Sequence, residues 1–488
     1  MPRRSQPHAN NRTPPSQSQT MQNDLPASIT TDPSLIHLDG RTLEGGGQLV
    51  RLALCLSALT AIPIHVHHIR GGRAGNHGGS QRGGLKSSHL AALEFLARAT
   101  AARTMGAFVG STEVVFEPGK GRDREALKRG KGGGEVHKIQ LSSPGSVWLI
   151  LQAILPWVIF AAVDEQPVRL MIEGGTNVSK SMSGEYVQNV MVPMFEKIGL
   201  PRFSVDVEKR GWTNGRSIEI GRVNVEIGSL KKGERLLQFF MTERGDISAL
   251  SMSVIAGTQG MRSALIKHTT QALANHPNLP PVLVGLAEPS DDPKRIYLLI
   301  VASTSNGYRL GRDWLYDQKI KTPYLNDAQT DALASKMAQR VTTDLLTEIA
   351  HGHCVDEFMR DQLVVFEALA QGTSVVAGQG DGGEEEEEED GESLHTKTCR
   401  WVVQKILGNE DNGDLSPGTT PGIGFVAGEV YFDRDSGRGN HDEAKRNHFQ
   451  ERDGGSQHGE NILTPDANAE TRVGVAQDIQ RNFSGLSI

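Results

Sequence analysis

The segment from Leu38 to Arg51 constrains this chain more than any other part of its sequence. It reads Leu-Asp-Gly-Arg-Thr-Leu-Glu-Gly-Gly-Gly-Gln-Leu-Val-Arg, so a carboxylate (Glu44), three glycines, an amide (Gln48) and a guanidinium (Arg51) stand together. Three consecutive glycines lose much backbone entropy on folding, which makes sense where the chain takes positive φ or lets another molecule approach its backbone. The segment therefore predicts a binding site rather than a spacer.

An amphipathic helix is expected directly after these glycines, because apolar residues recur at helical spacing from Leu49 to Leu59. Gln48 and Arg51 then fall in the first turns of this helix, whose N-terminal amides attract anions. A phosphate is the expected ligand, and Glu44 stands where a metal ion or a hydroxyl could reach it. The alternative is a glycine-rich turn before an ordinary amphipathic helix.

A second glycine-rich segment, with basic residues, follows a predicted strand. Residues 62–69 alternate in the manner of a strand, and Arg70-Gly-Gly-Arg73 comes next, with Arg82 and Lys86 behind it. Two guanidiniums on a glycine-rich corner bind an anion through paired hydrogen bonds, which lysine does less well. We therefore expect Arg70 and Arg73 to contact phosphate. The alternative is a solvated basic loop.

Further short motifs continue along the chain. They are Gly110-Ser-Thr-Glu113, Gly145-Ser146, Leu151-Gln152, Leu155-Pro156, Gly174-Gly-Thr-Asn177, Thr242-Glu-Arg-Gly245, Asp361-Gln-Leu363, Ala368-Leu-Ala370 and Leu394-His-Thr396. Together with the two segments above, and in this order, they resemble the RNA 3′-terminal phosphate cyclase family. The resemblance rests on the ordered set rather than on any one motif, and it covers residues 36–424 with interruptions.

The chain alternates predicted strands and helices, which is typical of an α/β fold. Residues 113–117 and 168–173 are predicted strands, and residues 91–100 and 146–162 are predicted helices. The resemblance implies a larger domain of repeated strand-and-helix units that is interrupted by a smaller α/β domain.

We place this insert at residues 235–346, between the two catalytic parts 36–234 and 347–432. A strand at 236–241, a strand at 296–302 and a long helix at 326–350 are predicted for the insert.

Composition sets apart three further segments. Residues 1–35 and 433–488 are rich in polar residues and glycine or proline, and we predict that both are disordered tails. Residues 377–392 are predicted to form a solvated acidic loop, because dense like charges repel, and a regulatory role is the alternative. The formal net charge is −7, and residues 384–390 alone carry seven negative charges, so basic loops can still dominate elsewhere.

Composition also narrows the class of protein. The three cysteines, at positions 55, 354 and 399, are too few and too scattered to predict a disulfide framework or a zinc site. The longest apolar run, 147–163, is broken by Gln152 and Pro156, so we expect no membrane span. No secretory signal is predicted near the N-terminus. We expect an intracellular protein and place it in the nucleus, in the nucleoplasm or the nucleolus.

His395 is the candidate nucleophile. It follows the acidic loop and precedes a helical pattern that starts at Trp401, so we expect it at a loop-to-helix junction. In the family that the chain resembles, the histidine of the Leu-His-Thr motif attacks the α-phosphorus of ATP. Neutral imidazole suits this role because it is nucleophilic near pH 7. AMP then passes to the RNA 3′-phosphate, and the neighbouring 2′-hydroxyl attacks to give a 2′,3′-cyclic phosphate. The alternative role is that of an ordinary packing or surface histidine.

The resemblance also implies the other site residues, the cofactors and the partner. Glu44 would hold Mg²⁺ or Mn²⁺, and Arg51, Arg70 and Arg73 would contact phosphates, because displacement at phosphorus needs charge neutralisation. Phe358 stands where the family often has a tyrosine against the adenine, and a phenyl ring keeps the stacking. The implied contacts to ATP are Gln48, Gln152, Phe358, Asp361 and Gln362. The implied partner is RNA that ends in a 3′-phosphate.

Two other function classes stay open beside this ATP-dependent, ligase-class enzyme. One is a non-catalytic, cyclase-like ribosome-biogenesis factor, whose relatives lack the histidine and the Glu-Gly-Gly-Gly-Gln motif. The other is a transferase of the enolpyruvyl type, which shares the repeat architecture but does not predict a nucleophile at His395. Retention of residues 44–48 and His395 favours the cyclase. Residues 210–216 depart from the family pattern by lacking a proline and a glycine run, which leaves open whether that loop contacts RNA or nucleotide.

Overall fold

The structure is a computed structural model. It describes residues 32–73, 83–119, 136–141, 143–162, 166–214, 218–318, 320, 325–376, 393–408 and 418–429, all within one compact unit of the chain. The predictions for the acidic loop 377–392, for the tail 433–488 and for all but the last four residues of the tail 1–35 lie outside the described residues.

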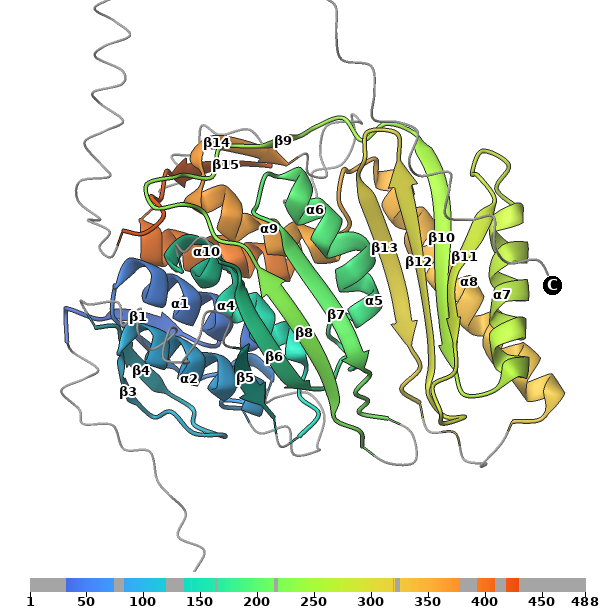
Figure 1. The fold of residues 1–488 in the computed structure, drawn as a ribbon, viewed down its shortest axis with the longest axis horizontal. Coiled ribbons are helices and arrows are strands. Elements are labelled where there is room, and N and C mark those ends of the chain that lie inside the picture. Colours follow the sequence, from blue (N-terminus) through green and yellow to red (C-terminus); the bar gives the residue numbers. More distant parts are fainter. Residues whose placement is uncertain are drawn as a thin grey trace, which may run out of the picture. The chain divides into compact units, whose positions relative to one another are not determined.

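A first strand-and-helix unit spans residues 36–117. Its elements are β1 (Ile36–Asp39), α1 (Gly47–Thr60), β2 (Ile64–His67), the 3₁₀ turn η1 (Gly71–Arg73), α2 (Ser87–Thr100), β3 (Arg103–Met105) and β4 (Val114–Glu117). The strands form one sheet in the order β1-β2-β4-β3, in the blue, N-terminal part of the fold where β1, β3 and β4 are labelled (Figure 1). Only β1 and β2 are parallel, and α1 makes the crossover that a parallel pair requires.

A second unit repeats this topology. It contains β5 (Val136–Gln140), α4 (Val147–Ala161), β6 (Val168–Gly174), α5 (Gly184–Tyr186), the π-helical turn η2 (Val187–Met191), α6 (Val192–Lys197), β7 (Phe203–Lys209) and β8 (Gly221–Ile227). The strand order is β5-β6-β8-β7, again with only the first pair parallel. The predicted α/β fold of repeated strand-and-helix units is confirmed.

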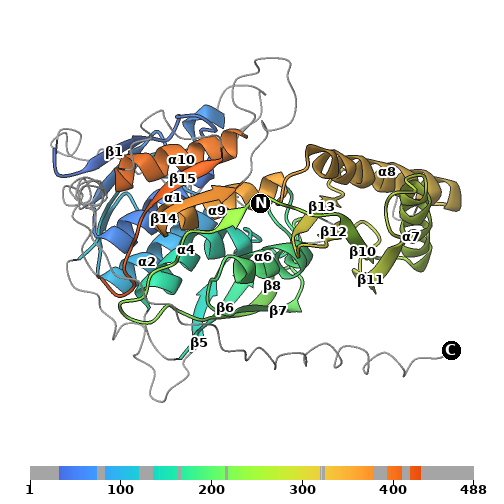
Figure 2. The same ribbon diagram turned by 90° about the horizontal axis from the view of Figure 1, so that it is seen from above.

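A third unit is interrupted after its first strand. It consists of β9 (Phe240–Met241), α9 (Glu357–Leu369), β14 (Gln371–Val376), α10 (Leu394–Leu407) and β15 (Thr419–Ile423), with β9 parallel to β14. The interruption holds β10 (Ile247–Ala256), α7 (Gln259–Ala274), β11 (Val282–Glu288), β12 (Ile296–Thr304), β13 (Arg309–Leu315) and α8 (Asp327–His351). Their sheet runs β11-β10-β12-β13, and α7 and α8 lie together against it (Figure 2).

The edges of this inserted domain differ from the predicted range 235–346. Strand β9 lies inside that range, yet its hydrogen bonds go to β14 of the third unit. Helix α8 continues to His351, where Gly352 ends it in the left-handed conformation. The insert therefore sits between β9 and α9 in the chain.

Strand β12 joins the inserted domain to the rest of the fold. Its side chains alternate between two faces of the sheet, as expected for a strand. Tyr297, Leu299 and Val301 belong to the main core, which also contains α1, α4 and α9. Their neighbours Leu298, Ile300 and Ala302 belong to a second core under α7 and α8.

Helix α4 lies in the middle of the main core and contacts both α1 and α9. Its sequence is apolar on nearly all sides, and such a helix is stable only when neighbours cover it all round. Ser146 caps its N-terminus by accepting a hydrogen bond from the Trp148 amide. Helix α10 packs on α1 and α9, and a hydrogen bond joins its first turn to the first turn of α1. Among the described helices, none combines the length and the apolar character needed to cross a bilayer.

Candidate active site

The glycine run forms the connection from β1 to α1, and close contacts explain why glycine stands there. Gly45 has a φ of 60°, and a Cβ atom on it would lie 2.9 Å from the Cα of Gly72 in the loop after β2. A Cβ on Gly47 would come within 2.5 Å of Nε2 of His89. The run therefore brings the two predicted anion-binding loops and His89 together.

The structure joins His395 to Gln48, although 347 residues separate them in the chain. His395 is an exposed residue in the first turn of α10, and its Nδ1 lies 2.6 Å from Oε1 of Gln48 in the first turn of α1. Ser393 caps α10 by accepting from the Thr396 amide. The predicted loop-to-helix junction at His395 and the predicted helix after the glycines are both confirmed.

The hydrogen bonds that Nε2 of Gln48 donates determine the orientation of the side-chain amide. Nε2 of Gln48 donates to Oδ2 of Asp361 at 2.6 Å and to Sγ of Cys399 at 3.0 Å. Because a carboxylate accepts and an amide NH₂ donates, Oε1 must face His395, and Nδ1–H of His395 must donate to it. In the neutral form of the ring, Nε2 of His395 is then the nitrogen without a proton.

The Asp361 carboxyl is the buried end of this chain of hydrogen bonds. Burial raises its pKa above the usual range, against the lowering effects of a hydrogen bond from Gln362, of the positive charge that His395 carries when it is protonated, and of the hydrogen bond from Gln48. Nε2 of Gln362 donates to Oδ1 of Asp361 at 2.8 Å, so amide donors reach both carboxylate oxygens. Two such donors match the ionised carboxylate. Burial also raises the pKa of the Cys399 thiol, which keeps the sulfur neutral.

Arg51 and Gln152 form a second pair in the same pocket. Nε of Arg51 donates to Oε1 of Gln152 at 2.7 Å, and this contact joins α1 to α4. The pocket around them has a volume of ≈ 30 Å³, and it is lined by Gln48, Arg51, Leu52, Trp148, Leu151, Gln152, Leu155, Pro156, Met182, Met191, Phe195, Asp361, Gln362, Val365, Phe366 and Cys399. Four of the predicted nucleotide-contacting residues and Arg51 therefore lie together.

Glu44 lies beside the His395 helix. Its backbone amide donates to Oγ1 of Thr398 at 3.2 Å, and Thr398 is one turn after His395 on α10. The predicted metal ligand and the predicted nucleophile are thus tied to the same short segment. A carboxylate oxygen at this position is a suitable hard ligand for Mg²⁺ or Mn²⁺.

The basic loop after β2 is only partly described. The Arg70 side chain is buried, and its Nη1 donates to the Gly84 carbonyl at 3.4 Å, so this guanidinium braces the loop. Arg73 ends the η1 turn, but its side chain and all of Arg82 lie outside the described residues. Lys86 is exposed at the start of α2. Phosphate contacts by Arg70 and Arg73 stay predictions.

Phe358 lies one turn before Asp361 on α9, so the two side chains share a face of that helix. The residue is 41% exposed, and its ring meets Tyr186 edge-on, with ring centroids 6.0 Å apart. The Arg312 guanidinium lies 4.6 Å from its centroid. Phe358 does not belong to the described residues that line the pocket. A base could stack on the exposed face of its ring.

Sequence reasoning missed three residues that the structure adds to the site. Cys399 accepts a hydrogen bond from Gln48, Thr398 accepts one from the Glu44 amide, and the His89 ring lies against Gly47. Helical spacing held a signal for two of them, because Thr398 and Cys399 follow His395 by three and four residues. His89 lies on α2, and nothing in its local sequence points to Gly47.

Comparison with known proteins decides the family. The family model of RNA 3′-terminal phosphate cyclases matches residues 42–411, which is more than half of the chain and includes Glu44, Asp361 and His395. The chain belongs to the RNA 3′-terminal phosphate cyclase family. The predicted resemblance is confirmed.

Individual members of the family are similar over most of the chain. An RNA 3′-terminal phosphate cyclase of Desulfurococcus amylolyticus is 29% identical over 359 residues, which are 70% of this chain and 86% of that protein. One of Methanopyrus kandleri is 29% identical over 390 residues, or 77% and 94% of the two chains. One of Sulfurisphaera tokodaii is 36% identical over 208 residues, or 42% and 55%.

Proposed function

We propose that this protein is an ATP-dependent enzyme that converts the 3′-terminal phosphate of an RNA into a 2′,3′-cyclic phosphate through a His395–AMP intermediate. Membership of the cyclase family and the names of the relatives support the overall reaction. The observation that carries the mechanism is the hydrogen bond from Nδ1 of His395 to Oε1 of Gln48. It holds an exposed imidazole at a helix N-terminus with its other nitrogen free to attack.

In the first step, Nε2 of His395 attacks the α-phosphorus of ATP. An N–P bond forms, the bond from the α-phosphorus to the bridging oxygen breaks, and pyrophosphate leaves. The ring becomes positively charged as the bond forms. The Nδ1–H then donates more strongly to Gln48, and the carboxylate of Asp361 stabilises this charge through the Gln48 amide, to which it is hydrogen bonded.

The same corner favours the negative charge of the phosphates. Gln48 and His395 each lie in the first turn of their helix, so the N-termini of α1 and α10 meet at the site. Backbone amides and the helix dipole attract anions there. The N-cap of α1 is Gly46, which has no side chain of its own to cap the helix or to keep a ligand away from its first turn. Arg51 adds a guanidinium to this corner, on the Gln152 side.

Glu44 is the residue that would hold the divalent cation. It is a hard carboxylate ligand next to the loop that carries Gln48, and its backbone is bonded to α10. A bound Mg²⁺ or Mn²⁺ supplies neutralisation of charge on the reacting phosphates.

In the later steps the AMP group moves from His395 to the RNA. An oxygen of the RNA 3′-phosphate attacks the phosphorus bound to Nε2, the N–P bond breaks, and a diphosphate bridge forms. The 2′-hydroxyl of the terminal ribose then attacks the RNA phosphorus, loses its proton, and AMP leaves. We assign recognition of the RNA phosphate to the loop that carries Arg70 and Arg73 and contacts Gly45, with Arg70 bracing the loop through the Gly84 carbonyl and Arg73 binding the phosphate.

ATP labelled at the α-phosphate tests the proposal. The protein should become labelled through an acid-labile, base-stable bond, and RNA with a 3′-phosphate should remove the label and yield a phosphatase-resistant end. His395→Ala should take up no label at an unchanged circular-dichroism spectrum. His353→Ala, which removes a histidine outside the site, should label normally. A labelled His395→Ala protein, or an unlabelled wild type, would overturn the mechanism.

A further inference from the structure

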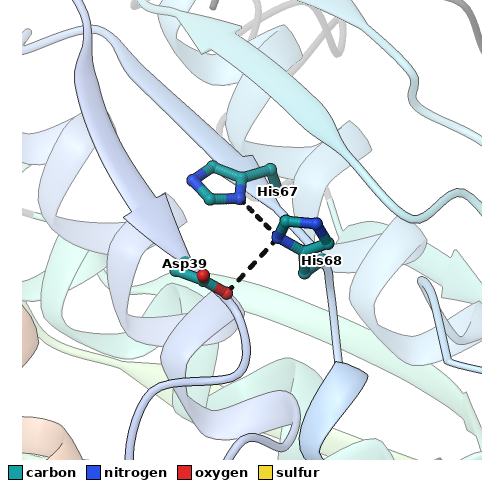
Figure 3. Close-up of side chains that lie close together, drawn as sticks. All are labelled: Asp39, His67 and His68. Carbon is teal, nitrogen blue, oxygen red and sulfur yellow. Dashed lines mark hydrogen bonds and ion pairs between the residues drawn. The ribbon is translucent and has the colours of Figure 1, made fainter.

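A cluster of metal-ligating side chains lies at the ends of β1 and β2. It consists of Asp39, His67 and His68, and the nearest ligand atoms of all three lie within 4.8 Å of one another. Nδ1 of His67 and Nδ1 of His68 are 2.7 Å apart, and Nδ1 of His68 is 3.5 Å from Oδ1 of Asp39 (Figure 3). None of the three belongs to the predicted catalytic set.

The backbone explains how three such residues converge. Strands β1 and β2 are parallel, with Asp39 opposite His67, so both residues lie at the same edge of the sheet. His67 and His68 are neighbours in sequence, and in a continuing strand their side chains would point to opposite faces. The strand ends at His67, however, and His68 takes a φ of 49°. This turn directs both imidazoles toward Asp39 (Figure 3).

We propose that Asp39, His67 and His68 bind a first-row transition dication such as Zn²⁺. Two imidazoles and one carboxylate are ligands that favour Zn²⁺ and its neighbours over Mg²⁺ or Ca²⁺. With ligand bonds of about 2.1 Å, two ligand atoms lie about 3.4 Å apart in a tetrahedral site and about 3.0 Å apart at a right angle. The observed 3.5 Å between His68 and Asp39 matches a tetrahedral pair, whereas the 2.7 Å between the two imidazoles is a hydrogen bond that must lengthen by a few tenths of an ångström when both rings bind the ion.

The surroundings leave room for further ligands. His68 is exposed, and the other two side chains are partly buried, so water can complete the coordination of the ion. The site also differs in chemistry from the cation site assigned to Glu44. That site rests on a hard carboxylate oxygen, whereas this one offers two imidazole nitrogens.

Arg41 competes with a metal for Asp39. Its Nε and Nη2 donate to the Asp39 carboxylate, with Nη2 at 2.6 Å from Oδ2, and its backbone amide donates to Oδ1 at 3.0 Å. The Arg41 side chain is 57% exposed, so it can leave the carboxylate for water at little cost. Removal of the guanidinium also removes a positive charge beside the ion. Arg41→Ala should therefore bind the metal more tightly than the wild type.

Calorimetric titration of the full chain with Zn²⁺, in a buffer that contains excess Mg²⁺, tests the site. We expect one equivalent to bind with the wild type, and affinity to fall at least 10-fold in His68→Ala and in Asp39→Asn. Co²⁺ should give a ligand-field absorption band that both variants lose. Glu44→Ala should keep the Zn²⁺ site, because Glu44 belongs to the other cation site.

His37→Ala provides the matched control. His37 stands on β1 two residues before Asp39, and its ring contacts His65 at 3.2 Å. The variant should bind Zn²⁺ like the wild type. Equal Zn²⁺ affinity in wild type, His68→Ala and Asp39→Asn would overturn the assignment, and so would loss of binding in His37→Ala with binding intact in His68→Ala. Binding of several weak equivalents that all variants share would mean non-specific binding to surface histidines and would overturn it as well.

Discussion

Replacing Gln48 by leucine should slow the self-adenylylation of His395 without preventing folding. Leucine keeps much of the volume of the side chain but removes the acceptor for Nδ1–H of His395 and a donor to Asp361. A hydrogen bond to a charged group contributes about 1.5–3 kcal/mol. The bond between His395 and Gln48 gains this character as the ring becomes charged, so its loss raises the barrier by a similar amount. The rate should fall about 10- to 150-fold.

The assay is single-turnover formation of the acid-labile AMP label at saturating ATP. Gln362→Leu is the matched comparison, because Gln362 also donates to Asp361 but does not touch His395 in the described contacts, and saturating ATP compensates for the loss of the nucleotide contact that we assign to it. Both variants should lower the free energy of unfolding, since each leaves the Asp361 carboxylate with one donor fewer. Only Gln48→Leu should lower the labelling rate more than 10-fold. A rate for Gln48→Leu within 3-fold of the wild type, or an equal loss in Gln362→Leu, would refute the role of Gln48.

Three further predictions concern the metal, the pH and the RNA. Glu44→Ala should slow adenylylation about 10²-fold or more and weaken its metal dependence, and unchanged rates across a Mn²⁺ titration would contradict this. Burial raises the pKa of Asp313 from 3.8 to about 6, so the folded protein holds a proton that the unfolded chain releases. The free energy of unfolding should therefore fall by about 3 kcal/mol as pH rises from about 4 to 6, and Asp313→Asn should remove this fall in urea titrations. The same pH dependence in Asp313→Asn and the wild type would contradict a raised pKa for Asp313. RNA with a 3′-phosphate should bind better than RNA with a 3′-hydroxyl, with a salt slope of about −0.7 for each contacted phosphate, and Arg73→Ala should erase most of the difference. Equal binding of both ends by the wild type would move the phosphate site elsewhere.

The local parts of the site could be predicted from sequence. Apolar periodicity and the glycine run placed Gln48 and Arg51 in the first turns of α1, and the structure confirms that helix. The same kind of pattern placed His395 at the start of α10. These features depend on residues that are close together in the chain, so the local sequence was sufficient to predict them.

The contacts between distant segments could not be predicted in the same way. The hydrogen bond from His395 to Gln48 depends on how α10 packs against α1, and no local pattern encodes that packing. The orientation of the Arg70 side chain is a second feature that local sequence did not predict. Its sequence context indicates an exposed anion-binding arginine, whereas its positive φ of 57° and its contact with the Gly84 carbonyl turn the guanidinium inward. A strand at 236–241 was predicted within the insert, but β9 pairs with β14 of the third unit, because the partner of a strand is not encoded in its local pattern.

The alternation of β12 between two cores has a consequence for cooperativity. If the inserted domain separated from the rest of the fold, Tyr297, Leu299 and Val301 would be exposed to water, at a cost of about 1.5–3 kcal/mol for each side chain. Because the main core and the second core share one strand, melting of either core exposes side chains of the other, so we expect the two cores to melt together. Heating should give a single calorimetric transition, and the amides of β12 should exchange with deuterium only through global unfolding. The insert thus behaves as part of one folding unit, although the chain enters and leaves it as if it were a separate domain.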